Sequence, residues 1–172
     1  MRIVLPARLE FRPVAVAAVA AACRSVDALP GDPIHSSPPL VRGSDLLLRS
    51  RFDSMAASFA VIDFRRRFDA ELASAVSEIF NNIALHAYAR SGHGEIVIEL
   101  EPIPGCARVR ISDMGERFDI HAVPVPDIAA LPESGLGLHI AFACVDVLHY
   151  QPGPPNVWWL EKRARTEDRS RG

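Results

Sequence analysis

The sequence predicts a two-layer α+β sandwich, in which helices pack on one face of a mixed, mostly antiparallel sheet. Residues 95–100 and 107–112 alternate apolar and polar side chains around a short turn with proline and glycine, which is typical of a β-hairpin. Residues 67–89 carry apolar side chains at helical spacing. A hairpin flanked by helices within 172 residues favours one domain rather than two.

The predicted helix at residues 67–89 has two distinct faces. At about 100° per residue, Glu78 and Asn82 lie well away from its apolar stripe, and His86 lies at the border. The stripe consists of Leu72, Val76, Ile79 and Ile83. The helix therefore presents one face to a core and a separate polar face to something else.

The N-terminal third is less regular. Residues 2–7 predict an edge strand, and the alanine-rich residues 14–28 predict a helix. The proline-rich residues 29–45 predict a flexible insert without regular structure. Residues 46–64 are ambiguous between a strand and a short helix.

The C-terminal half predicts a loop, a helix and a strand. Residues 113–134 show no regular period and contain several prolines, so they predict a long loop. Residues 135–150 begin with glycines and continue as an apolar run, which predicts a loop that leads into a buried helix. Residues 156–162 predict the final strand. The single domain then covers residues 1–165, and the charged residues 166–172 predict a disordered tail.

Composition narrows the possible functions. The net charge is -2, which gives no reason to expect direct nucleic-acid binding. Cys23, Cys106 and Cys144 are far apart in apolar surroundings, which favours buried free thiols in a reducing compartment. The most apolar segment, residues 13–23, is shorter than the roughly 20 residues that span a bilayer. We therefore expect a cytoplasmic protein without a membrane anchor.

Glu78 and Asn82 lie one turn apart on the predicted helix. An amide oxygen is a neutral ligand suited to Mg²⁺. A carboxylate one turn earlier can deprotonate a hydroxyl beside that metal. The alternative is an ordinary solvated helix face, where the same two residue types are common.

Two glycine-containing segments suggest a nucleotide. Asp113 ends a predicted strand, and its carboxylate can accept a hydrogen bond from an exocyclic amine such as that of adenine. Gly115 allows a planar ring to approach the backbone, although a simple turn explains both residues equally well. The glycine-rich residues 135–138 precede a helix and can present N–H groups to phosphate, or they form only a flexible connection. The sequence contains no P-loop pattern.

Taken in order, these segments resemble the anti-sigma-factor serine kinases of the GHKL, or histidine kinase-like, ATPase superfamily, which also includes histidine-kinase catalytic domains. "SEIFNNIALHAY", residues 77–88, resembles the Asn box of that superfamily. "DMGERFD" at 113–119 and "GLGLHIA" at 135–141 resemble its first and second glycine boxes. The resemblance covers about residues 66–162. The His-Ala-Tyr ending of the first segment favours the anti-sigma branch.

The resemblance implies the superfamily's Bergerat-type fold, with ATP held between the long helix and a lid at residues 116–134. Asn82 would ligate Mg²⁺, Glu78 would be the general base toward a serine of a partner protein, and Asp113 would bind the adenine amine. The other implied nucleotide-binding residues are His86, Gly115, Gly135, Leu136 and Gly137. The implied partners are a sigma factor and a small anti-anti-sigma protein of the STAS type, and kinases of this branch often form homodimers.

The sequence departs from this pattern at the glycine boxes. Arg117 stands where a second glycine is usual, and a left-handed backbone at a non-glycine residue costs about 1–2 kcal/mol. Glu133 and Ser134 stand where Gly-Arg is usual, and a carboxylate there is unfavourable beside a triphosphate.

Three hypotheses follow. The first is an active serine kinase that also binds a sigma factor. The second is the same fold with weak or no phosphotransfer, which regulates a partner by sequestration and which Arg117 and Glu133 favour. The third is a detached histidine-kinase catalytic domain, which the short lid disfavours.

Overall fold

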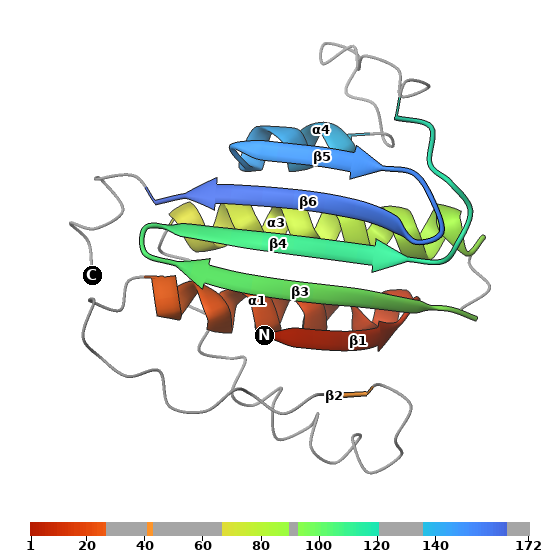
Figure 1. Cartoon of the computed structure of the whole chain (residues 1–172), viewed down its shortest axis with the longest axis horizontal. Coiled ribbons are helices and arrows are strands. Elements are labelled where there is room, and N and C mark those ends of the chain that lie inside the picture. Colours follow the sequence, from red (N-terminus) through yellow and green to blue (C-terminus); the bar gives the residue numbers. More distant parts are fainter. Residues whose placement is uncertain (27–40, 43–66, 90–92, 121–135, 165–172) are drawn as a thin grey trace.

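A computed structural model of the protein describes residues 1–26, 41–42, 67–89, 93–120 and 136–164. These residues form a six-stranded sheet in the order β2-β1-β3-β4-β6-β5, with the helices on one of its faces (Figure 1). Only β1 and β2 run parallel; every other neighbouring pair is antiparallel. The predicted fold class, a mostly antiparallel sheet with helices on one face, is therefore confirmed.

The strands lie close to where alternation predicts them. They are β1 (Arg2–Pro6), β2 (Val41–Arg42), β3 (Glu95–Ile103), β4 (Cys106–Asp113), β5 (Val147–Gln151) and β6 (Asn156–Arg163). The hairpin between β3 and β4 turns at Gly105, whose φ of 74° favours glycine.

The helices form one layer. They are η1 (Leu9–Phe11), α1 (Arg12–Val26), α3 (Arg67–Asn82), the π-helical turn η2 (Ile83–Ala87) and α4 (Gly137–Cys144). Helix α3 packs between α1 and α4, and α1 and α3 also contact the sheet. The predicted stripe of α3 is buried at all four positions, which explains why this helix is central.

Four expectations from the sequence were wrong. The apolar run at residues 135–150 is not one helix: α4 ends at Cys144, and Val147–Gln151 forms the edge strand β5. Strand β1 is not at the edge, because Val41–Arg42 pairs beside it. These two residues also show that the insert, which was expected to lack regular structure, contains a short strand. The helix expected to run to residue 89 also leaves regular α geometry after Asn82. The rest of the insert, residues 46–64 and the tail lie outside the described residues.

The core is built from rows of side chains that cross the sheet on its helical face. One row joins register partners on five strands, namely Ile3, Ile98, Ile111, Trp158 and Tyr150, all of which are buried. The next residue along each strand points to the opposite face of the sheet. Trp158 is therefore 1% exposed, whereas its neighbour Trp159 is 44% exposed. Alternation along each strand thus decides which side chains meet the helices.

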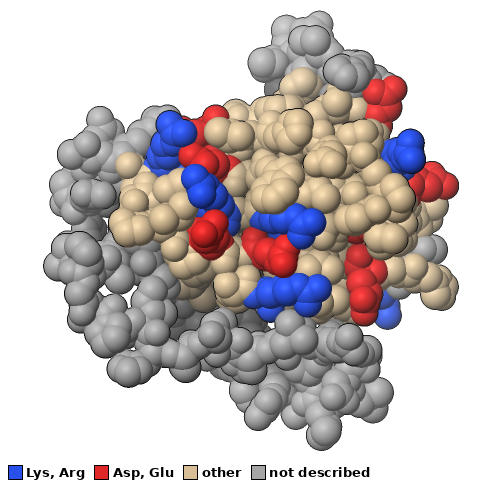
Figure 2. All heavy atoms as spheres, viewed as in Figure 1, with Lys and Arg blue, Asp and Glu red and all other residues tan. Residues whose placement is uncertain are grey.

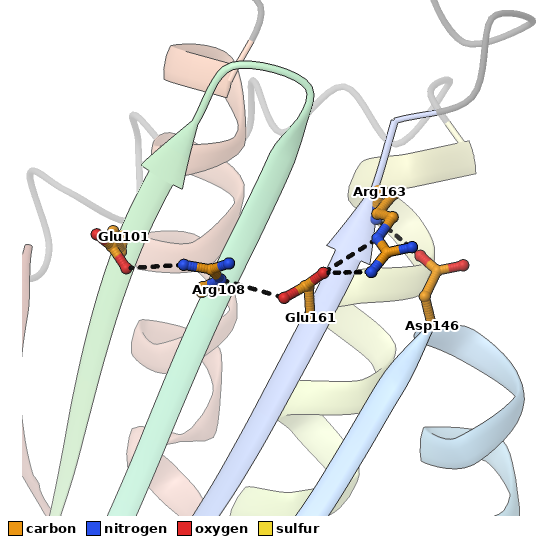
Figure 3. Close-up of polar contacts among 5 residues, drawn as sticks. All are labelled: Glu101, Arg108, Asp146, Glu161 and Arg163. Carbon is orange, nitrogen blue, oxygen red and sulfur yellow. Dashed lines mark hydrogen bonds and ion pairs between the residues drawn. The ribbon is translucent and has the colours of Figure 1, made fainter.

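The opposite face of the sheet carries charged side chains, and none of the described helices covers it (Figure 2). Across β3, β4 and β6 the charges alternate in sign, from Glu101 through Arg108 and Glu161 to Arg163 (Figure 3). The backbone N–H of Arg163 continues this line by donating to Asp146 at 2.7 Å. Exposed ion pairs of this kind contribute little to stability, so they do not hold the fold together.

The described residues contain no helix that is both long and apolar enough to cross a membrane. The three cysteines are free, as expected, but only Cys23 is fully buried. Burial raises the pKa of the thiols of Cys106 and Cys144, which keeps both protonated near neutral pH.

A buried ion pair links α3 to the sheet. The Lys162 ammonium, in a side chain that is 4% exposed, contacts the carboxylate of Glu71. Glu71 also accepts a hydrogen bond of 2.6 Å from Arg67. Burial acts to raise the pKa of Glu71, but the hydrogen bonds from Lys162 and Arg67 outweigh it and lower that pKa. The carboxylate thus has two cationic partners, whereas the Lys162 ammonium is bonded to Glu71 alone among the described residues.

This asymmetry predicts unequal effects on stability. Glu71→Ala leaves the Lys162 charge buried and unpaired, so we expect a loss of about 3–5 kcal/mol. Lys162→Met leaves Glu71 with Arg67 and should cost less than about 2 kcal/mol. Urea unfolding followed by circular dichroism measures both, with the double variant Glu71→Leu/Lys162→Met as the control. Equal losses in the two single variants would contradict the assigned pairing.

Candidate functional site

A pocket of about 380 Å³ opens where the end of α3 faces the end of β4. Its polar lining includes Asn82, His86, Asp113, Glu116 and Arg117. Its apolar lining consists of Ile83, Leu85, Ala87, Ala89, Phe118, Tyr150 and Trp158. Two residues that the sequence singled out from separate segments, Asn82 and Asp113, therefore face the same cavity.

The register of the sheet places Asp113 at this pocket. Asp113 is the last residue of β4 and pairs directly with Asn156, the first residue of β6. Both side chains are buried, and the Asn156 Nδ2 donates to Asp113 Oδ1 at 3.1 Å. The Gly115 N–H donates to the same oxygen at 2.8 Å. Burial raises the pKa of the Asp113 carboxyl, and these two hydrogen bonds oppose that rise.

The segment after β4 donates backbone hydrogen bonds to three residues, at the end of η2 and on β5. The Met114 N–H donates to Tyr88 Oη at 2.9 Å, and Tyr88 in turn donates to the carbonyl of Glu95. The Glu116 N–H donates to the carbonyl of Ala87 at 2.8 Å. The Phe118 N–H donates to Tyr150 Oη at 2.9 Å. The pocket wall formed by residues 114–118 is therefore preorganised.

Gly115 is required by contact and not by backbone conformation. A Cβ on Gly115 would lie 2.5 Å from the carbonyl oxygen of Ala87, which is backbone and cannot rotate away. The structure assigns positive φ to Ala89 and Gly105 but not to Gly115 or Arg117. The replacement of the second box glycine by Arg117 therefore introduces no left-handed strain, contrary to the cost considered from the sequence.

The α-helical part of α3 ends at Asn82, directly at the pocket. The π-helical turn η2 follows, and the Tyr88 N–H bonds to the carbonyl five residues earlier, at Ile83. His86 lies in this turn and is exposed at the rim of the same pocket that Asn82 lines. Single π turns inside helices are often found at functional sites.

Asn82 has an unused polar atom. Its Nδ2 is buried, and no described residue offers it an acceptor. A buried donor without an acceptor is unfavourable by about 1–3 kcal/mol, so it is a natural place for a ligand oxygen. This orphaned amide, together with the Asp113 carboxylate and the aromatic side chains of the lining, fits a purine nucleotide with an anionic tail.

The residues present also fit Mg²⁺ carried by a nucleotide. No cluster of three or more His, Cys, Asp or Glu side chains occurs among the described residues, so a cage made entirely of protein ligands is not seen there. The amide oxygen of Asn82 is the kind of single neutral ligand that Mg²⁺ takes when phosphate oxygens and water complete its shell.

Glu78 lies one turn before Asn82 and is covered by the start of α4. A Cβ on Gly137 would lie 2.4 Å from Glu78 Oε2, so a larger residue there would displace the carboxylate. Gly137 is the first residue of α4, and Leu136 is its N-cap. Neither residue lines the pocket itself, and the same is true of Glu78 and Gly115. Gly135, Glu133, Ser134 and the lid beyond residue 120 lie outside the described residues.

Sequence reasoning missed several residues of the pocket. Phe118, Tyr150 and Trp158 form an aromatic group, with the Tyr150 and Trp158 rings 4.4 Å apart and Phe118 within 6.2 Å of both. Tyr150 was missed because strand β5 was not predicted. Asn156 was missed although it begins a strand that was predicted. The turn "PGPPN" before that strand was the available signal, because it fixes where β6 begins.

Gly115→Ala should disturb the pocket wall. The new methyl group must push the Ala87 carbonyl away and weaken its bond to Glu116, at a cost of about 1–3 kcal/mol. Thermal unfolding measures this loss. Gly153→Ala is the matched control, because its Cβ would meet nothing closer than 3.3 Å. A variant at Gly115 as stable as that at Gly153 would contradict the close approach.

Asp113→Asn should change how the stability of the protein depends on pH. The raised pKa of Asp113 means that its protonated form favours the folded state; this contribution is present at low pH and is lost as pH rises through the folded pKa. An Asn at 113 keeps the Oδ1 acceptor, so the stability of the variant relative to wild type should increase from acid to neutral pH. Urea unfolding between pH 4 and pH 8 tests this, and a decrease would contradict it.

Comparison with protein families matches residues 46–160 to the histidine kinase-like ATPase domain. Among solved structures, the histidine kinase domain of the blue-light-activated histidine kinase from Erythrobacter litoralis EL346 is similar with a TM-score of 0.45 and 18% identity. That match covers 60% of this chain and 48% of the other, so this chain spans about half of that structure's length. No curated protein matches.

The family match covers most of the chain and includes every described residue that lines the pocket. The protein therefore belongs to the histidine kinase-like ATPase family.

Proposed function

We propose that this protein is an ATP-dependent serine/threonine-protein kinase that also acts as an anti-sigma regulatory factor. The observation that carries the proposal is the convergence of Asn82 and Asp113 on one pocket, with Glu78 one turn before Asn82. Family membership supports ATP binding. The His-Ala-Tyr ending of the Asn box supports the serine-kinase branch.

The adenine end of the pocket follows from its chemistry. Asp113 presents a carboxylate to an exocyclic amine, and Gly115 lets the loop after β4 approach Ala87, which also lines the pocket. Phe118, Tyr150 and Trp158 supply an apolar aromatic wall on which such a ring packs. The hydrogen bonds that hold residues 114–118 fix these groups before the nucleotide arrives, which lowers the entropy lost on binding.

The phosphate end depends on α3. Mg·ATP, when bound, supplies the γ-phosphoryl group and the metal charge that neutralises it. Asn82 offers an amide oxygen to the metal and a buried N–H to a phosphate oxygen. Glu78 holds a carboxylate one turn away and takes the proton of the attacking serine hydroxyl as general base. A Cβ on Gly137 would lie 2.4 Å from Glu78 Oε2, so glycine at this position leaves the carboxylate in place.

The proposed partners are a small anti-anti-sigma protein of the STAS type, which carries the serine, and a sigma factor, which the kinase sequesters. The proposed site of action is the cytoplasm, where ATP is available and free thiols persist. A homodimer is the proposed assembly.

A second candidate is the same fold acting as a regulator by sequestration, with little phosphotransfer. Two observations favour it: Arg117 lines the pocket where the resemblance expects glycine, and Gly137 covers the Glu78 carboxylate. The two candidates differ in phosphotransfer, which only the first requires.

Glu78→Gln separates them. Gln keeps the size of the side chain but cannot take a proton, so transfer to a serine-bearing STAS-type protein should fall by about 10²–10⁴-fold. The affinity for Mg·ATP should change by less than about tenfold, or 1.4 kcal/mol. Calorimetry measures binding, and labelled ATP measures transfer.

The same assays on wild type decide between the candidates. Binding without transfer favours sequestration, and transfer that survives in Glu78→Gln excludes Glu78 as the base. No binding at millimolar Mg·ATP would overturn the kinase candidate and leave sequestration.

A further inference from the structure

Asn156 is the most completely bonded side chain at the pocket. It is 1% exposed, and its Nδ2 lies 3.1 Å from Asp113 Oδ1, 3.0 Å from the Gly115 carbonyl and 3.4 Å from the Glu116 carbonyl. Its Oδ1 accepts a hydrogen bond of 3.1 Å from the Gly153 N–H. One amide therefore joins the end of β4, the loop after it and the turn before β6.

These partners fix the orientation of the amide. The Gly153 N–H requires an acceptor, and the three groups on the other side are all acceptors. Turning the amide over would place a donor against a donor and an acceptor against three acceptors. The two hydrogens of the NH₂ group serve the two nearest oxygens, and the Glu116 carbonyl shares one of them. A serine or threonine hydroxyl has a single hydrogen and could not do this.

The consequence falls on Asp113. Its Oδ1 is occupied by Asn156 and by the Gly115 N–H, whereas no described residue bonds to its Oδ2. These two bonds fix the plane of the carboxylate. Its Oδ2 is left to accept from a donor in the pocket that Asp113 lines. Asn156 also stabilises the ionised form of Asp113 against the burial that raises its pKa.

We infer that Asn156 is a positioning residue that sets the preference of the pocket for a purine bearing a 6-amino group, because it orients Asp113 toward that amine. Asn156 does not line the pocket, so it acts through Asp113 and through the backbone of Gly115 and Glu116. This inference rests on the nucleotide-binding part of the proposed function and is independent of phosphotransfer.

The test compares two nucleotides, Mg·ATP and Mg·purine riboside triphosphate, which lacks the 6-amino group. In Asn156→Ala the affinity for Mg·ATP should fall by about 10-fold to 100-fold, and the affinity for the deaminated analogue should change far less. Asn156→Leu keeps a side chain of similar size but removes the donors, so it should show the same selective loss. Circular dichroism verifies that each variant is folded.

Tyr88→Phe is the matched control. It removes the hydroxyl that accepts from Met114, on the same loop, but leaves the Asn156–Asp113 contact in place. We expect it to affect both nucleotides alike. A second readout is the pH profile of Mg·ATP binding, whose acid limb should move to higher pH in Asn156→Ala, because Asp113 loses the donor that favours its ionised form.

The outcomes are distinct. A selective loss of affinity for Mg·ATP, together with a shifted acid limb in the pH profile of its binding, supports the inference. An equal loss of affinity for both nucleotides, or an unchanged preference for ATP over the analogue, would mean that Asn156 has only a structural role. Either result overturns the inference, while the proposed function stands. A wild-type protein that binds neither nucleotide overturns the inference and the proposed function together.

Discussion

The pairing of β4 with β6 is the constraint on which the pocket depends. The alternation that turns Ile111 and Trp158 toward the helices also turns the next residues on that face, Asp113 and Asn156, toward them. A buried carboxylate is unfavourable unless donors surround it. The amide of Asn156 and the N–H of Gly115 supply those donors, so the pocket is a polar continuation of the core and not a separate loop site.

The end of α3 supplies the opposite side of the pocket. Its α-helical part ends at Asn82, and the π turn that follows leaves the Ala87 carbonyl facing the loop after β4. The Glu116 N–H bonds to that carbonyl, and only a glycine at 115 permits the approach. The loop after β4 is thereby bonded to the end of α3, which brings two segments distant in sequence together at the cavity.

Charge is distributed differently at the pocket and on the open sheet face. On the open face the acids and bases alternate and neutralise one another. Among the described residues that line the pocket, Arg117 is the one arginine or lysine, beside the carboxylates of Asp113 and Glu116. A ligand with an anionic tail would meet an arginine where glycine is usual, without the backbone strain that the sequence alone suggested.

The sequence by itself determined the class of fold, because period 2 in the hairpin and helical spacing in α3 directly report which side chains are buried. It also pointed to Asn82, Asp113 and the motif order on which the family resemblance rests. The strand β5 was not predicted because its short alternation, from Val147 to Tyr150, follows directly on a mainly apolar helix, where the period does not distinguish strand from helix.

Only the tertiary structure decided which residues meet. Strand register made Asn156 the partner of Asp113, and a π turn follows Asn82 where the sequence predicted a regular helix. The packing of α4 placed Gly137 on Glu78. Contacts of this kind join residues far apart in the chain, and local periodicity carries no information about them, because they are set by how whole elements pack together.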